Sequence, residues 1–438
     1  MNKAQKIISI CLAISLIVSC AVFSYAAPTQ PAPVQKSTIA EEELQRIAEL
    51  SSDKYNHLLQ VWSKDPNYPS DTDANFPDFY GGAYVDDNKE LVILVTILND
   101  ETIDYFGNLI DLEHVRFSLA DNSFQELLYV QETIENCLDS NSLDENSSAL
   151  ITGTGISIKE NAVIVYAATE DLDNICNSFT RVYSARNSQP YNIRFRSLWM
   201  NTDPVRYTVP EQNNETFPYN VSGILVQPGG PVCVHVSGNK ILPTSVGFWA
   251  KNSSGELGIV TAAHGEIQSG QSVYASKTGY YRDEYFGYIS NAICRDEVDA
   301  AFVKRNTSDP ERFPPVRYVD GWDFNLKSTT RLMAEGEEIY KKGIETGVTR
   351  GKVTDINFNP NSYDSTIKLT SAVLTDCVAD VSDSGGIVAG GGTTSSRYVV
   401  GIVAGGMWYG TPSGQTTPVQ MYYSKAPSIL SALKLTLY

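Results

Sequence analysis

Histidine is scarce in this sequence, and positive charge is in deficit. Its 438 residues include four His, and 33 Lys and Arg stand against 51 Asp and Glu, for a formal net charge of -18. This charge argues against a nucleic-acid partner, because binding to phosphates depends on Lys and Arg. No two cysteines have CxxC spacing and none clusters with histidine, so we expect no metal site and no other cofactor.

Long hydrophobic runs are also absent, apart from one near the start of the chain. "IISICLAISLIVSCAV" follows Lys3 and Lys6 and precedes the small residues of "SYAA". This order is that of an export signal, so residues 1–26 are predicted to be a signal peptide and the protein to be secreted. A second route stays open, because "IVSC" resembles a lipoprotein box. Cys20 would then be acylated, and the membrane would be a partner through that lipid.

Acidic residues are unevenly distributed along the chain. Residues 27–216 carry 12 Lys and Arg against 31 Asp and Glu, whereas residues 217–438 carry 19 against 20. An asymmetry of this kind indicates a boundary between two modules. Between residues 203 and 231, Pro, Asn and Gly are frequent and periodicity is weak, which predicts an exposed linker and processing region at 204–222. A Pro- and Gln-rich segment at 27–39 is predicted to be another linker.

Residues 40–203 mix helical and extended patterns. "STIAEEELQRIAEL" combines capping-box spacing with one apolar face, and "SLADNSFQELLYVQETIENCL" also has helical spacing. Two hairpin patterns, "GGAYVDDNKELVILVTI" and "GTGISIKENAVIVYAAT", each place a polar turn between extended runs, and "YNIRFRSLW" alternates. This module is therefore predicted to be α+β.

Short β-rich runs follow one another in residues 223–438. Gly, Asn and Asp separate the runs "SVGFWAK", "LGIVTAA", "QSVYAS", "FGYIS", "AAFVK", "GKVTDI", "IKLTS" and "YVVGIVAGG". Only the tail, "APSILSALKL", has helical spacing. The pattern predicts an all-β sandwich or a pair of barrels.

Three residue types that together can hydrolyse a peptide bond occur in this second module. His264 follows an apolar strand in "GIVTAAHG", Asp299 begins another in "EVDAAFVK", and Ser384 lies in "DVSDSGGIVAGG". A serine nucleophile needs a histidine base, a buried carboxylate that orients the base, and amides that face the oxyanion. Each residue alone also fits a turn, a cap or a surface position. Their order is that of the chymotrypsin-type arrangement, and it differs from those of subtilisin and the α/β-hydrolases.

These motifs resemble those of bacterial chymotrypsin-fold serine proteases of the streptogrisin and alpha-lytic type. "VTAAHG", "VDAAF" and "SDSGG" resemble the family's His, Asp and Ser boxes, "KKGIETGVTRGKV" its Gly-Thr-Gly segment, and "VVGIVAGG" the strand that lines its substrate groove. The two hairpins before the linker resemble those of the pro-region that these proteases use as a folding helper. The resemblance covers residues 40–438. It implies two antiparallel β-barrels at 223–438, preceded by an α+β pro-region at 40–203.

The resemblance also implies a catalytic triad. His264 would be the general base, Asp299 the residue that orients it, and Ser384 the nucleophile. Ala404 stands where the family has a Ser that supports the triad Asp. No acidic residue is evident near Val378, at the base of the specificity pocket, so cleavage after Lys or Arg is not favoured and an apolar or small residue is expected.

By the same resemblance, the amides of Ser382 and Ser384 would form the oxyanion hole. Asp383 would be the buried carboxylate behind this hole, and Lys341 would be its basic partner. Ser382 stands where the family has Gly, so a glycine-like backbone conformation there would be strained.

The cysteines depart from the family pattern. Gly265 stands where the family has a Cys after the active-site His, and none of the three family disulfides keeps both partners. A pair of Cys233 with Cys294 or Cys377 stays open, since export permits disulfides.

The function predicted from these features is that of a secreted serine endopeptidase made as a preproprotein. Its partners would be a protein or peptide substrate and its own pro-region. One alternative is a catalytically silent binding module on the same fold, either secreted or anchored at the cell surface through Cys20. A non-peptide hydrolase such as an esterase is a third possibility.

Overall fold

The computed structural model describes nine segments of the chain. They are residues 39–72, 74–139, 150–169, 171–186, 192–198, 224–308, 311–361, 369–410 and 416–438. The predicted signal peptide, the predicted processing linker and all but the last residue of the first linker lie outside these segments. The chain divides into two compact units, Met1–Glu42 and Glu43–Tyr438, and the features described below lie in the second, apart from the first residues of one helix. No helix within the described segments is long and apolar enough to cross a membrane.

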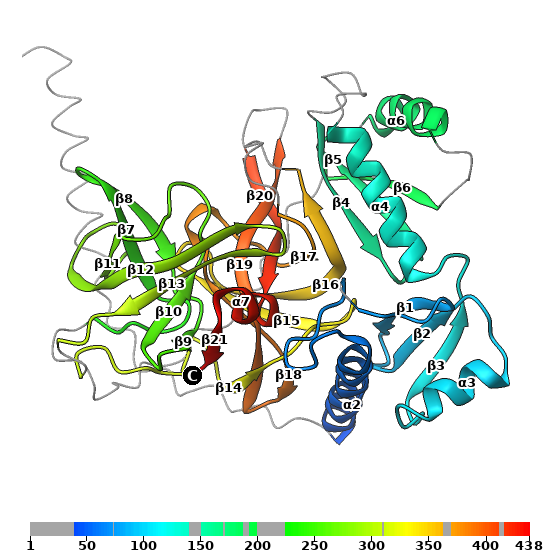
Figure 1. Ribbon diagram of the computed structural model, residues 1–438, viewed down its shortest axis with the longest axis horizontal. Helices are drawn as coiled ribbons and strands as arrows, with labels where there is room; N and C mark the ends of the chain where they lie inside the picture. The colour runs from blue at the N-terminus through cyan, green and yellow to red at the C-terminus, as the bar shows by residue number, and fades with distance from the viewer. Residues whose placement is uncertain are drawn as a thin grey trace, which may run out of the picture. The chain divides into compact units, whose positions relative to one another are not determined.

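Residues 39–198 contain two successive groups of elements with the same order (Figure 1). In each group a helix precedes an antiparallel hairpin, and a second helix leads to a strand that pairs in parallel with the hairpin. The first group is α2 (Ile39–Trp62), β1 (Tyr80–Val85), β2 (Leu91–Val95), α3 (Asp100–Gly107) and β3 (Val115–Leu119). The second group is α4 (Phe124–Asp139), β4 (Ile151–Ser157), β5 (Ala162–Ala167), α6 (Leu172–Arg186) and β6 (Ile193–Ser197). The predicted α+β organisation and both predicted hairpins are confirmed.

Local sequence signals determine where these elements begin. Ser123 and Glu126 form a capping box before α4: the Glu126 amide donates to Ser123 Oγ at 3.2 Å, and the Ser123 amide donates to Glu126 Oε2 at 2.7 Å. Asn99 caps α3 by accepting from the Thr102 amide at 2.8 Å. The run "LVILV" of β2 is buried at every residue, because this strand lies between β1 and β3 in a three-stranded sheet.

The first β-sheet of residues 224–438 is rolled around its own core. Its strand order is β21-β9-β10-β13-β12-β11-β7-β8. Val234 of β7 and Ile259 of β10 belong to opposite halves of the sheet and lie in one buried cluster, which requires the sheet to curl. The strands are β7 (Pro231–Ser237), β8 (Lys240–Ser245), β9 (Trp249–Asn252), β10 (Leu257–Thr261), β11 (Ser272–Ala275), β12 (Glu284–Arg295), β13 (Val298–Arg305) and β21 (Leu435–Leu437).

The second sheet closes into a barrel. Its strands follow the order β15-β18-β19-β20-β17-β16, and a further pairing of β15 with β16 completes the ring. The elements are β14 (Asn325–Thr330), β15 (Glu338–Gly343), β16 (Gly347–Pro360), β17 (Ala372–Thr375), the 3-10 turn η1 (Val381–Asp383), β18 (Ile387–Thr393), β19 (Ser396–Gly410), β20 (Thr416–Lys425) and the helix α7 (Ala426–Leu433). Phe302 of the first sheet, Ile402 of the second and Ile429 of α7 share a buried cluster that joins the two barrels. The predicted two-barrel fold is confirmed.

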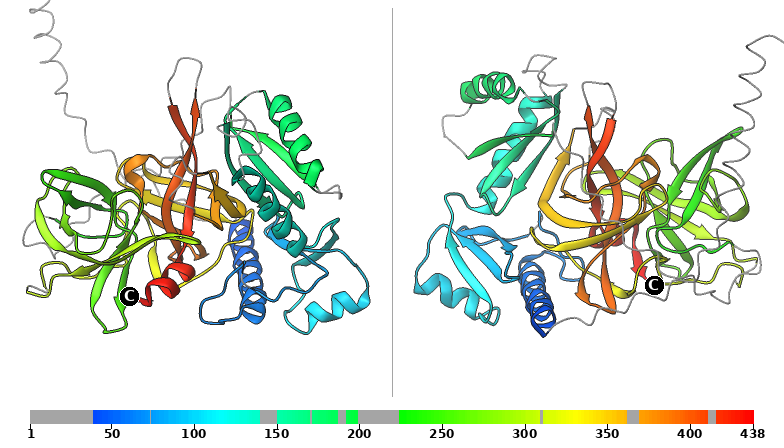
Figure 2. Two further views of the ribbon diagram at one scale, coloured as in Figure 1. Left: turned by 45° about the horizontal axis from the view of Figure 1, so that its top comes forward. Right: turned by 180° about the vertical axis from the view of Figure 1, so that it is seen from behind.

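The barrels and the preceding α+β part share a sheet and a core. The outer end of β16 pairs with β4, with Asn359 opposite Thr154 and Pro360 opposite Gly153, so the second sheet continues through β4, β5 and β6 (Figure 2). One buried cluster contains Leu58 of α2 together with residues of the second barrel such as Val388, Val403 and Met421.

Candidate active site

Two neighbouring strands bring His264 and Asp299 together. β10 and β13 are antiparallel partners, with Thr261 opposite Ala301, so the end of β10 lies beside the start of β13. His264 follows β10, and Asp299 is the second residue of β13. Asp299 Oδ2 lies 2.5 Å from His264 Nδ1, and its Oδ1 accepts from the Ala263 amide at 2.8 Å.

The Asp299 carboxylate controls the ionisation of His264. Its negative charge raises the pKa of His264 above the ordinary value of 6.5, and this effect outweighs the opposing effect of burial. Asp299 itself is only 2% exposed. Its amide donates to Ser424 Oγ at 3.1 Å. Ser424, on β20, was not identified from the sequence, because it lies 125 residues away and belongs to no motif.

Ser384 lines the same cavity as His264 and Asp299. The cavity measures about 400 Å³. Its lining consists of His264, Gly265, Cys294, Asp299, Pro360, Leu369, Asp380, Val381, Ser384, Val403, Ala404, Gly405, Gly406 and Tyr422. The sequence predicted no acidic residue near Val378, whereas Asp380 contributes to this lining. The Asp380 carboxylate is engaged locally, since it accepts from the Val381 amide at 2.6 Å.

The Ser384 hydroxyl bonds to the backbone of its own turn. Ser384 Oγ donates to the Val381 carbonyl oxygen at 3.2 Å. Within the described part of the chain, no hydrogen bond joins Ser384 to His264. The structure therefore places the three predicted residues around one cavity, but only His264 and Asp299 are in direct contact.

The segment before Ser384 adopts a 3-10 turn, η1. A capping box encloses it, in which the Asp380 amide donates to Asp383 Oδ2 at 2.9 Å. Carbonyls in a 3-10 turn point toward the amide three residues on, so the Val381 carbonyl is directed at the Ser384 amide. The oxyanion hole expected from the amides of Ser382 and Ser384 stays a prediction. Ser382 is not among the residues with positive φ, so the strain expected at this position does not arise.

Asp383 and Lys341 form a buried ion pair behind this turn. Lys341 Nζ, on β15, donates to Asp383 Oδ2 at 2.9 Å, and neither side chain is exposed. Thr346 Oγ1 donates to the same oxygen at 2.5 Å, and the Glu345 amide donates to Asp383 Oδ1 at 2.9 Å. Burial disfavours the carboxylate, but the Lys341 ammonium and these donors outweigh it and hold the pKa of Asp383 below its ordinary value.

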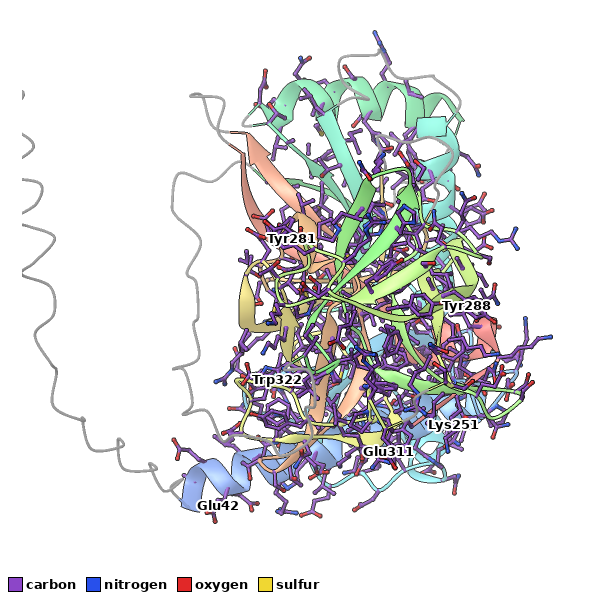
Figure 3. The ribbon with its side chains drawn as sticks, turned by 90° about the vertical axis from the view of Figure 1, so that its left-hand side faces the viewer. Glu42, Lys251, Tyr281, Tyr288, Glu311 and Trp322 are labelled. Carbon is purple, nitrogen blue, oxygen red and sulfur yellow. The ribbon has the colours of Figure 1, made fainter. Side chains whose placement is uncertain are left out.

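Two side chains that the sequence gave no reason to select also meet the turn. The Tyr280 hydroxyl lies 3.3 Å from Ser382 Oγ, and it donates to Glu345 Oε2 at 3.3 Å. Tyr280 lies between β11 and β12, in a loop at the surface, where its neighbour Tyr281 is visible (Figure 3). Ser245, at the end of β8, holds the other side of the turn by donating to the Ser382 carbonyl at 3.0 Å.

The open question of disulfide pairing has a structural answer. Cys233, Cys294 and Cys377 carry no disulfide in the structure. Burial raises the pKa of Cys233 to about 11 and that of Cys377 to about 12, so both remain thiols at neutral pH.

Among the described residues, no group of three or more His, Cys, Asp or Glu side chains is placed to hold a metal ion.

One family model matches the first part of the chain. Residues 32–114 match the family model described as Pro-like N-terminal domain. This part is similar to a pro-like domain. The match agrees with the pro-region that the resemblance to streptogrisin- and alpha-lytic-type proteases implied. No curated protein matches the chain.

Solved structures similar to the chain are bacterial proteases. The Nocardiopsis protease is 26% identical with a TM-score of 0.36, over 48% of this chain and 98% of its own. Thermobifida fusca protease A is 21% identical with a TM-score of 0.35, over 49% and 98%. Cellulomonas bogoriensis chymotrypsin is 18% identical with a TM-score of 0.36, over 49% and 98%. TM-scores this low carry no argument about the fold, which rests on the strand order of the two barrels.

Proposed function

We propose that this chain is a secreted serine endopeptidase, made as a preproprotein, that hydrolyses peptide bonds through an acyl-enzyme intermediate. The observation that carries the proposal is the 2.5 Å contact between His264 Nδ1 and Asp299 Oδ2 at the edge of a cavity that Ser384 also lines. An oriented histidine beside a serine is the arrangement that generates an alkoxide-like nucleophile at neutral pH.

Each residue has a role in this reaction. Ser384 Oγ would leave the Val381 carbonyl, rotate toward His264 Nε2 and attack the scissile carbonyl, while His264 accepts its proton. Asp299 fixes the imidazole through Nδ1 and stabilises the imidazolium that forms. His264 then returns the proton to the leaving amine, and water hydrolyses the acyl group by the same path. Asp383 and Lys341 would support the turn that carries Ser384.

The substrate would be a protein or peptide that lies along β19. The cavity wall formed by Val403, Ala404, Gly405 and Gly406 is small and uncharged, which suits an apolar or small side chain before the scissile bond. Of the two carboxylates in the lining, that of Asp299 contacts His264, and that of Asp380 accepts from a backbone amide. Cleavage after Lys or Arg is therefore disfavoured in this proposal.

Residues 40–203 would act as a pro-region that helps the barrels to fold, and residues 204–222 would be the processing region. The pairing of β4 with β16 and the buried cluster shared by α2 and the second barrel support this role. Such contacts would let the first part guide the folding of the second barrel. Residues 1–26 would be removed on export.

A fluorophosphonate probe tests the proposed reaction, because it phosphonylates a serine that a histidine activates. We expect the full-length chain to be labelled, and Ser384→Ala and His264→Ala not to be labelled. A folded wild-type chain that resists the probe, with and without removal of residues 1–203, would contradict the proposal. Mass spectrometry of the protein from culture supernatant would identify the mature N-terminus, and a lipid on Cys20 would replace secretion with surface anchoring.

One observation favours a second candidate function, that of a catalytically silent binding module. Ser384 Oγ is bonded to the Val381 carbonyl oxygen and not to His264. A module that only binds peptides would need no hydrogen bond between Ser384 and His264. Turnover of any peptide that disappears in His264→Ala excludes this candidate.

A further inference from the structure

Lys425 of the second barrel holds a carboxylate that comes from the first part of the chain. Its ammonium donates to Oδ1 of Asp71, and neither side chain is more than 3% exposed. Lys425 Nζ also donates to Ser371 Oγ at 2.9 Å. Burial raises the pKa of Asp71 above its ordinary value of 3.8, and the charge and hydrogen bond of Lys425 limit that rise. The Asp71 carboxylate therefore occupies a site whose cation and hydroxyl belong to residues 369–438.

A second hydroxyl of the barrel is directed to the same place. Tyr423 precedes Lys425 by two residues on β20, so both side chains leave the same face of the strand. Tyr423 is 1% exposed, and its hydroxyl has no hydrogen-bond partner among the described residues. Burial raises the pKa of Tyr423, and the charges of Glu337 and Asp71 add to this effect, so the hydroxyl lies within electrostatic range of the Asp71 carboxylate. The site thus combines one ammonium with two hydroxyls, which are donors that suit a carboxylate.

The barrel itself holds these three groups. β20 pairs with β19 at Lys425 and with β17 at Tyr423. The Ser371 amide donates to Asn359 Oδ1, on β16, at 2.6 Å. All of these contacts lie after the predicted processing region, so the site should keep its shape when Asp71 is removed.

The loop that supplies Asp71 also forms one wall of a cavity of about 550 Å³. The cavity lining includes Tyr68 and Ser70 of this loop, Glu297 of the turn between β12 and β13, and Ser428 of α7. Ser70 adjoins Asp71 in the chain. Removal of the loop therefore takes away the carboxylate together with the wall beside it, and an anion from solvent can then approach along the path that the loop had filled.

Loss of the loop would leave Lys425 without its counter-ion. A buried ammonium that loses its partner keeps the cost of desolvation without the compensating attraction, so a replacement anion is favoured. Glu297 is one candidate within the chain, because its charge, added to burial, raises the pKa of Asp71. Its carboxylate is held elsewhere, however, since Ser428 Oγ donates to Glu297 Oε2 at 2.9 Å. The geometry therefore favours an anion from outside the chain.

We propose that Lys425, Ser371 and Tyr423 form a carboxylate-binding site, which Asp71 occupies in the full-length chain and which processing vacates. The vacancy rests on the proposed function, because only removal of the first part takes Asp71 away. The ligand is a carboxylate, either of a small molecule or of an acidic side chain. Ser424, next to Lys425, accepts from the Asp299 amide, so a ligand in this site stabilises the strand that supports the candidate triad.

Formate tests the site in the full-length chain without any catalysis. Asp71→Ala removes one carboxylate group, and formate has the size of the group removed. In the Ser384→Ala background, we expect about 100 mM sodium formate to lower the unfolding equilibrium constant of Asp71→Ala about tenfold relative to sodium chloride, as for a Kd of about 10 mM. The chain with Asp71 intact and the double variant Asp71→Ala/Lys425→Met should not respond. Glu43→Ala, which removes an exposed carboxylate, is the matched control and should not respond either.

The processed protein from culture, with Ser384 blocked by the fluorophosphonate probe, tests whether the site is vacant. Formate should lower its unfolding equilibrium constant by a similar factor. The peptide acetyl-Tyr-Pro-Ser-Asp-Thr-amide copies residues 68–72, and the same peptide with Asn in place of Asp is its matched control. Binding of the Asp peptide about tenfold tighter than the Asn peptide would identify an acidic side chain as a ligand. A response to formate without that difference would identify a small carboxylate, and either result supports the proposal.

The other outcomes overturn it. If Asp71→Ala does not respond to formate, or if the response survives Lys425→Met, the site does not exist and the proposed function stands. Where Asp71→Ala does not fold in chloride, its refolded yield in formate gives the same comparison. A processed protein that responds to neither ligand, or that responds only in Glu297→Gln because Glu297 has replaced Asp71, also overturns the proposal alone. Recovery of only the unprocessed chain overturns the vacancy and the proposed processing together.

Discussion

Asp71 and Lys425 lie 354 residues apart in the chain and form a buried ion pair. Asp71 belongs to the loop after α2, and Lys425 is the last residue of β20. Lys425 Nζ also donates to Ser371 Oγ at 2.9 Å. Because Ser424 next to it accepts from the Asp299 amide, the pair joins the α+β part of the chain to the strand that supports the candidate active site.

Removing the carboxylate of this pair should destabilise the whole chain. Asp71→Asn leaves the Lys425 ammonium buried without a counter-ion, and we expect a loss of about 3–5 kcal/mol in the free energy of unfolding. Urea unfolding of the full-length chain in the Ser384→Ala background, which excludes self-cleavage, measures it. Glu43→Gln, which breaks the exposed pair with Arg46, is the control and should change little. Equal losses in the two variants would contradict the prediction.

A second contact across the same boundary depends on a tyrosine. The Tyr166 hydroxyl of β5 donates to Asp355 Oδ2 of β16 at 2.5 Å, while Oδ1 of Asp355 has no partner among the described residues. Burial raises the pKa of Asp355 to about 6, and the Tyr166 bond limits that rise. Tyr166→Phe should therefore cost about 1–3 kcal/mol of unfolding free energy and move the Asp355 pKa upward. A neutral effect in urea unfolding would show that water replaces the hydroxyl.

Glu335 predicts how stability depends on pH. This glutamate accepts from Ser157 Oγ at 3.1 Å and from the Ile158 amide at 2.5 Å, at the tip of the β4–β5 hairpin. Burial raises its pKa from 4.5 to about 8. The folded protein therefore binds this proton more tightly than the unfolded chain does. The free energy of unfolding should fall as pH rises from about 4.5 to about 8, by up to about 1.4 kcal/mol per pH unit.

Glu335→Gln should flatten that dependence. Unfolding free energies at several pH values between 5 and 8 measure the slope. Glu338→Gln is the matched control: although burial raises the pKa of Glu338, the hydrogen bonds from Arg350 and Tyr340 and the charges of Arg350 and Arg397 together outweigh burial and lower that pKa. The Glu338 carboxylate stabilises the fold at every pH above its ordinary pKa, and this effect is lost only below that pKa. In Glu338→Gln the slope of the unfolding free energy between pH 5 and 8 should therefore persist. A slope unaltered in Glu335→Gln would refute this assignment.

The pH dependence of labelling should report His264. The base must be neutral, and Asp299 raises its pKa above 6.5, so the labelling rate should rise with pH through a midpoint above that value. In Asp299→Asn the midpoint should move to lower pH, because the charge that stabilises the imidazolium is gone. The rate at the plateau should fall by about 10⁴, since an Asn amide facing Nδ1 favours the tautomer with its proton on Nε2, which cannot accept the proton of Ser384. A midpoint that does not move would mean that another group controls the profile.

Local patterns were sufficient to predict the two hairpins, the helices α2, α4 and α7 and a β-rich second module, whereas the choice of two barrels came from the resemblance. The helices α3 and α6 were not predicted. "LVILV" was recognisable as a strand because every residue of it is buried, and the tail helix because its apolar spacing matches the buried face of α7. "IKLTS" was predicted as extended, but β17 begins directly after it, and of its described residues only Leu369 forms a bridge, to Asp296. That bridge depends on a residue far away in sequence, which no local pattern contains.

The candidate site was predictable only to the extent that it lies in motifs. His264, Asp299 and Ser384 each occupy a short recognisable run. Tyr280 and Ser424 do not, because they reach the site from 102 and 125 residues away through single hydrogen bonds. The conformation of η1 could not be predicted either, since the side chains that hold it, those of Ser245 and Lys341, come from 137 and 42 residues away.

The pairing of β4 with β16 has a consequence for processing. A cut anywhere between residues 198 and 224 breaks one covalent connection, while the shared sheet and the shared core remain. The immediate product would be a nicked two-chain particle that elutes as one species. Separate polypeptides would then appear only on denaturation, or once a protease has degraded the acidic partner, and a cleaved band on a denaturing gel would not by itself indicate a liberated enzyme.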